Sequence, residues 1–176
     1  MSDRLLKALL VMLLIAAPSL AQTAAELRHK YGEPERLSPK SSQILVERYM
    51  VRGSITMTAK FAGSSARACE LRIEPRRTRT QNSKRVDVMS EFESEQVIKE
   101  LAPDDARGRL IKSSNAEFGC STVRFGDYER VMIAVTSRCE AQGGGTYFVK
   151  IRWKDTVCEQ IDRQASMAVV NGNSVN

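Results

Sequence analysis

Apolar and polar residues alternate with a period of two in three consecutive stretches, at 43–51, 54–61 and 68–73. Such alternation predicts strands whose sheet has one packed face and one solvated face. Turns at 52–53 and 63–65 separate the three stretches, so we expect an antiparallel meander. The middle stretch shows the pattern most clearly, because its apolar positions are Ile55, Met57, Ala59 and Phe61.

A short helix is predicted just before this meander. Thr23 can cap its start, and Glu26 stands three residues later, as in a capping box. Gly32 and Pro34 then end it. The helix would present two side chains four positions apart on one face, Leu27 and Tyr31.

The strongest helix pattern follows over 90–102. Ser90 with Glu93, or Ser94 alone, can cap its start, and Pro103 stops it. Acidic residues crowd the first turn, where they favour the helix dipole. An apolar stripe would face the core at Val97, Ile98 and Leu101. A further helical turn is predicted over 104–110.

Strand patterns return in the last third of the chain. We expect a short strand over 120–125 and longer ones over 128–139 and 146–153, with a glycine turn at 143–145. One strand would bury Val131, Ile133 and Val135, and the other Tyr147, Val149, Ile151 and Trp153. The order of elements predicts an α+β fold of two helix-plus-three-stranded antiparallel sheet units, stapled by disulfides. The expected parts are units at 22–75 and 90–160, a basic linker at 76–89 and a mobile tail at 161–176.

Residues 1–21 have the features of a secretory signal. Arg4 and Lys7 precede an apolar run that is too short to span a bilayer, and small residues at Ser19 and Ala21 suit a cleavage site. The competing interpretation is a short membrane anchor that is kept. Because no later stretch is apolar enough to span, we expect an exported protein, periplasmic or extracellular. Removal of the signal leaves 25 Lys+Arg against 20 Asp+Glu, a net charge of +5.

Four cysteines lie after the signal, and export would place them where disulfides form. Without a CxxC motif, and with one histidine far away, metal binding is disfavoured. Three connectivities are possible in principle. The predicted strands favour one bridge within the second unit and one between the units, Cys120 with Cys139 and Cys69 with Cys158.

Parts of the chain resemble known families. The helix that ends in "YGEP", followed by three strands, resembles the BamE/SmpA type of bacterial envelope domain, although no cysteine stands at the cleavage site for a lipid anchor. Two such units in one secreted chain are similar to the β-lactamase-inhibitor-protein architecture. The whole mature region, including "ACELRIEP" and "VIKELAPDDARG", looks like small secreted bacterial proteins of unassigned function. These likenesses imply a binding or scaffold role.

No catalytic, cofactor or metal motif is evident. The single histidine, His29, is expected to be solvated, and P-loop, GxSxG, GxGxxG and HExxH patterns are absent. We therefore expect no enzyme activity, no cofactor and no metal. The alternative is a small secreted hydrolase that uses carboxylates, since paired acids from distant segments leave no local signature.

A basic stretch joins the two predicted units. It is either a solvated crossover loop or a contact for an anionic envelope component or a secreted protein. Nucleic acid is not expected, because no aromatic residue interleaves the basic ones. Outer-face Tyr49 and Phe148 could anchor such a contact. The candidate contact residues are Arg76, Arg77, Arg79, Lys84, Arg85, Lys150 and Arg152.

Overall fold

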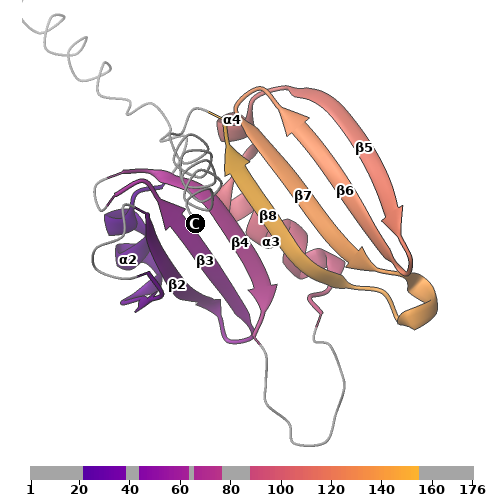
Figure 1. Cartoon of the computed structure of the whole chain (residues 1–176), viewed down its shortest axis with the longest axis horizontal. Coiled ribbons are helices and arrows are strands. Elements are labelled where there is room, and N and C mark those ends of the chain that lie inside the picture. The colour runs from indigo at the N-terminus through magenta and orange to yellow at the C-terminus, as the bar shows by residue number, and fades with distance from the viewer. Residues whose placement is uncertain (1–21, 39–43, 64–65, 77–87, 155–176) are drawn as a thin grey trace, which may run out of the picture.

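The computed structural model describes residues 22–38, 44–63, 66–76 and 88–154 (Figure 1). The predicted signal, most of the predicted basic linker and the predicted C-terminal tail therefore lie outside the described residues. The helical elements are α2 (Ala24–Tyr31), α3 (Glu91–Leu101), α4 (Asp104–Arg107) and a 3-10 turn, η1 (Glu140–Gln142). The strands are β1 (Glu35–Arg36), β2 (Leu45–Arg52), β3 (Ile55–Phe61), β4 (Ala68–Pro75), β5 (Leu110–Phe118), β6 (Ser121–Tyr128), β7 (Val131–Arg138) and β8 (Thr146–Trp153).

All eight strands form one antiparallel sheet in the order β1-β2-β3-β4-β8-β7-β6-β5. The two halves join where β4 pairs with β8, with Leu71 opposite Ile151. The prediction of two separate sheet units is therefore wrong. Two separate sheets would each leave the edge of a last strand unpaired, whereas pairing β4 with β8 satisfies both edges. The α+β class itself is confirmed.

The helices lie on one face of this sheet, which we call the helix face. Leu27 of α2 and Val97 of α3 belong to the same buried core as the inward residues of the strands, and Figure 1 shows α3 behind β8. The alternation predicted for the strands is confirmed by the burial of Ile55, Met57, Ala59, Phe61, Leu71, Ile73, Val131, Ile133, Val135, Val149, Ile151 and Trp153. Tyr147, predicted on the same face as Val149, is only partly buried, because the register of β7 with β8 shifts there and Thr146 is buried instead. We call the opposite face, on which no described helix lies, the open face.

Both predicted capping boxes are present. The Thr23 side chain accepts from the backbone N–H of Glu26, and the Ser90 side chain accepts from that of Glu93. Each glutamate carboxylate in turn accepts a hydrogen bond from the backbone N–H of the cap residue. Local side chains therefore satisfy backbone N–H groups at both helix starts. Val97 and Leu101 are buried and Ile98 is partly buried, as the stripe predicted.

Sequence patterns missed β5 and shortened β6. The helical turn predicted over 104–110 ends at Arg107, and the chain then enters β5 from Leu110 to Phe118. β5 is one of the two edge strands, and nearly all its residues are exposed on both faces. Because an exposed edge strand buries neither face, its sequence carries no alternation of apolar and polar residues.

Candidate binding surface

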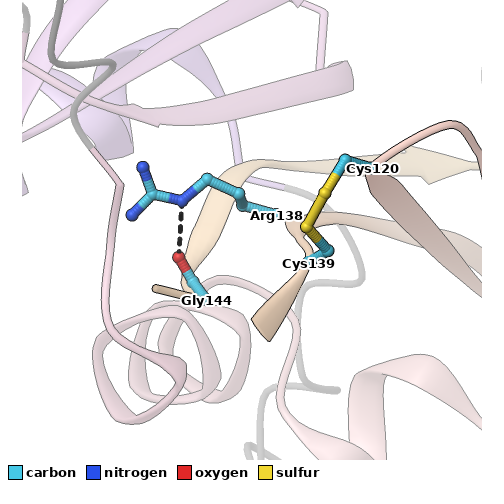
Figure 2. Close-up of a disulfide and its surroundings, with 4 residues drawn as sticks. All are labelled: Cys120, Arg138, Cys139 and Gly144. Carbon is cyan, nitrogen blue, oxygen red and sulfur yellow. Dashed lines mark hydrogen bonds between the residues drawn. A yellow bond between two sulfur atoms is a disulfide. The ribbon is translucent and has the colours of Figure 1, made fainter. Parts of the chain in front are cut away.

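The predicted bridge between Cys120 and Cys139 is present (Figure 2). It ties the turn between β5 and β6 to the end of β7. Next to it, Arg138 donates from Nε to the carbonyl of Gly144 at 3.0 Å, across the turn into β8. These contacts connect the β5–β6 turn, the end of β7 and the turn into β8 at one end of the sheet. A disulfide also agrees with the predicted export.

Cys69 lies buried at the start of β4 and is disulfide-bonded. Its predicted partner, Cys158, lies outside the described residues. Cys69 sits at an irregularity in the pairing of β3 with β4, between the pairs Lys60–Glu70 and Phe61–Ala68.

The predicted contact residues fall into two groups. Arg77, Arg79, Lys84 and Arg85 lie outside the described residues. Arg76 is exposed, and its backbone N–H donates to the carbonyl of Ser54 at 2.7 Å, which holds the start of the linker against the turn between β2 and β3. Lys150 and Arg152 lie on the open face, where the register places them opposite Arg72 and Glu70 of β4.

Carboxylates neutralise part of the positive charge on this face. Glu70 pairs with Arg152 at 2.7 Å and with Lys60 at 3.2 Å, and Arg72 pairs with Glu74 at 3.0 Å. Burial alone would raise the pKa of Glu70, but the hydrogen bonds and charges of its basic neighbours outweigh burial and lower this pKa. The Glu70 carboxylate therefore stays charged between Lys60 and Arg152, and these ion pairs order the three side chains.

Positive charge remains in excess on the open face. Directly opposed residues of antiparallel strands point to the same face, so the register assigns each side chain. Eight cationic side chains against four carboxylates give a net charge of +4. The cations are Arg48, Lys60, Arg72, Lys112, Arg138, Lys150, Arg152 and Lys154, and the acids are Glu35, Glu70, Glu74 and Asp127.

An apolar hollow interrupts the charged rows. Its volume is about 210 Å³, and Phe125, Met132 and Ala134 line it together with Lys150 and Arg152. Phe125 and Met132 are 45% and 42% exposed, which is unusual for large apolar side chains placed side by side on adjacent strands. The sequence analysis did not select Phe125 and Met132 as candidate contact residues, although both occupy solvent-facing positions in predicted strands whose apolar and polar residues alternate.

The two predicted aromatic anchors differ. Phe148 lies over the open face, with the guanidinium of Arg72 4.0 Å from its ring centroid. Tyr49 is only 1% exposed and lies on the helix face, so its assignment to the outer face is wrong. Its hydroxyl donates at 2.5 Å to buried Glu47, which also pairs with Arg28 of α2. Burial and this hydrogen bond raise the pKa of Tyr49.

Residues suited to metal binding are not gathered in the described part of the chain. No group of three or more His, Cys, Asp or Glu side chains lies close enough there to hold a metal ion. His29 is exposed on α2, in line with its predicted solvation. Among the described residues, no helix has the length and apolar character of a membrane span.

Comparison with known proteins gives a distant structural match. No protein-family model matches the sequence. No curated protein matches it either. One similar solved structure is a cysteine-rich secretory protein from Staphylococcus aureus subsp. aureus Mu50, with a TM-score of 0.42 and 8% sequence identity. The match covers 78% of this chain and 45% of that protein, so the chain spans less than half of its length.

Proposed function

We propose that this chain is a binding module, exported to the bacterial envelope or beyond it, whose open face receives an acidic protein surface. The proposal assigns it binding rather than catalysis. The observation that carries it is the apolar hollow at Phe125 and Met132 within a face of net charge +4. Protein interfaces combine a desolvated apolar centre with a polar rim in this way.

The hollow favours a protein over a polysaccharide or a lipid headgroup. An anionic polymer needs only the charges, whereas a hollow of about 210 Å³ can accept an apolar side chain. Lys150 connects the hollow to the charged part of the open face, because it lines the hollow and lies opposite Arg72 of β4. An acidic side chain next to an apolar one in the partner would therefore match this surface.

A defined peptide can test this function. The probe is a peptide of alternating glutamate and leucine, compared with one of alternating lysine and leucine, in titration calorimetry with the full mature protein at low and high salt. We expect the acidic peptide alone to bind, and binding to weaken as salt screens the charges. Amide shifts in an NMR titration should cluster on β6, β7 and β8.

Charge reversal locates the contact. Lys150→Glu, alone and with Met132→Glu, should weaken binding by about tenfold or more, as for a lost contact at the centre of an interface. Arg36→Glu is the matched control, because Arg36 is exposed and is paired with buried Glu47 in register, on the other side of the sheet. Equal effects of the two reversals, or salt-insensitive binding, would reject the proposal. Binding to phosphatidylglycerol vesicles but not to the acidic peptide would replace the protein partner with a membrane.

A further inference from the structure

A second groove lies on the helix face, beside α3 and above the half of the sheet that the helices leave uncovered. Its volume is about 430 Å³, within the range of sites for small molecules. α3 forms one wall, and β5, β6 and β7 form the floor. The lining that matters here comes from Ile98, Lys99, Arg107, Leu110, Arg124 and Tyr128.

Arg107 is the unusual member of this lining. It is only 9% exposed, although arginine is rarely buried without full pairing. Its Nε donates to the carbonyl of Ala102, and its Nη1 lies 3.1 Å from Asp104. Its guanidinium carbon lies 5.6 Å from the ring centroid of Tyr128. The remaining nitrogen, Nη2, is buried and has no hydrogen-bond partner among the described residues.

An unpartnered guanidinium nitrogen is costly when water does not reach it. The hydrogen bond to Ala102, the ion pair with Asp104 and the nearby Tyr128 ring allow this guanidinium only small movements, so it does not swing out to solvent. A carboxylate is the partner that fits best, because its two oxygens match the planar fork of arginine. Since Nη2 itself is covered, binding would include a small rotation of the guanidinium toward the groove.

The surrounding charges also favour an anion. Lys99 forms no ion pair among the described residues, and Arg124 pairs with Glu91, which does not line the groove, at 3.2 Å. Glu95 is the one acidic side chain of the described lining, against Lys99, Arg107 and Arg124. The lining therefore carries three cations against one acid, and among these cations Lys99 has no ion pair within the described residues, whereas Arg107 and Arg124 are paired with Asp104 and Glu91.

Apolar surface lies next to this charged end. Leu110 is 48% exposed, and Ile98 and the Tyr128 ring complete the apolar part of the lining. Gly126 makes room for the ring, because a Cβ there would lie 2.8 Å from a ring carbon of Tyr128. The glycine in β6 thus allows the ring to lie across the strand and to reach Arg107.

We propose that this groove binds a carboxylate carried on an apolar body, with the carboxylate at Arg107 and the body against Ile98, Leu110 and Tyr128. The site lies on the opposite side of the sheet from the open face, so it does not depend on the function proposed above. A fatty acid and the free C-terminus of an apolar peptide share this chemistry.

Titration calorimetry with the full mature protein tests the site. The probes are octanoate, the matched octanol, and a leucine-rich dipeptide with either a free carboxyl terminus or a C-terminal amide. We expect at least one free acid to bind about tenfold more tightly than its uncharged counterpart, the scale of a charge-assisted hydrogen bond. The octanoate and dipeptide arms distinguish the two sources of the carboxylate. Ring resonances of Tyr128 should shift on binding.

Variants distinguish the site from general attraction of anions. Arg107→Gln should lose the preference for the free acid, while Arg109→Gln should keep it, because Arg109 is exposed beside the groove and does not line it. If Arg107→Gln unfolds, Lys99→Gln and Arg124→Gln together should weaken acid binding by a few fold in a folded protein. Equal affinity for acid and uncharged probe, or equal effects of Arg107→Gln and Arg109→Gln, would overturn the proposal.

Discussion

Tyr31 at the end of α2 donates a hydrogen bond of 2.6 Å to the Glu100 carboxylate in α3, across 69 positions of sequence. The same carboxylate pairs with Lys30 at 3.0 Å and with Arg52 of β2 at 3.2 Å. Glu100 therefore joins α3 to α2 and to the first half of the sheet, on the face opposite the proposed partner surface. With the pairing of β4 and β8, this contact makes the two predicted units one body.

Removing the charge of Glu100 should loosen this connection. In Glu100→Gln the side chain keeps its size, but three contacts lose a charged acceptor. We expect the free energy of unfolding to fall by about 1–2 kcal/mol, more than for an isolated surface pair because the carboxylate is largely covered and shared. Urea denaturation measures the change.

Glu95→Gln is the matched control for this prediction. Glu95 lies on the same helix, is exposed and forms no ion pair among the described residues. Its replacement should change the unfolding free energy by no more than about 0.5 kcal/mol. Losses of the same size in both variants would mean that the contact with Tyr31 does not hold the halves together.

Stability should depend on acid pH through Glu70 and Glu100. Burial raises both pKa values, but hydrogen bonds and charges from basic and tyrosine neighbours lower both below the ordinary 4.5 overall. Since the unfolded chain then binds more protons, these groups stabilise the fold above about pH 4.5, and this stabilisation is lost as pH falls through their folded pKa values.

The measurement is the free energy of unfolding from pH 3 to pH 7, with Glu70→Gln/Glu100→Gln as the comparison. We expect the wild-type protein to lose more stability than the double variant below about pH 4.5, and the two to run parallel above pH 6. A double variant that keeps the full acid dependence would assign this dependence to other carboxylates.

Local signals in the sequence predicted local structure well. The Thr23–Glu26 and Ser90–Glu93 boxes are both formed, because their contacts lie within three residues. The joining of the two halves could not be predicted, because the strands are equally regular whether β4 ends a sheet or pairs with β8. Tyr49 was assigned to the wrong face for a related reason. Odd-numbered and even-numbered positions of its strand each contain apolar and charged residues, so alternation does not decide which of the two sets faces the core.

The candidate sites were still less visible in sequence. Phe125 and Met132 meet only through the pairing of β6 with β7. Arg107 gains its environment from α4 and from Tyr128, which lies on a different element. A single basic residue in a charged stretch gives no sign that it will be buried with an unpartnered nitrogen.

The Cys120–Cys139 bridge should stabilise the β5–β6 end of the sheet. The cysteines are 19 positions apart, and closing a loop of this length removes unfolded-state entropy worth about 3 kcal/mol in the chain-entropy description. Cys120→Ser/Cys139→Ser should therefore unfold at lower urea than the wild-type protein. The variant should also speed up hydrogen exchange of amides near Ser121 more than that of amides in β8.

Mutation is a cleaner test than reduction, because reduction also breaks the bond at Cys69. Under reducing conditions the wild-type protein and the double variant should become nearly equal in stability. A gap of the same size in reduced samples would show that packing of the sulfur atoms, and not the covalent link, stabilises this end of the sheet.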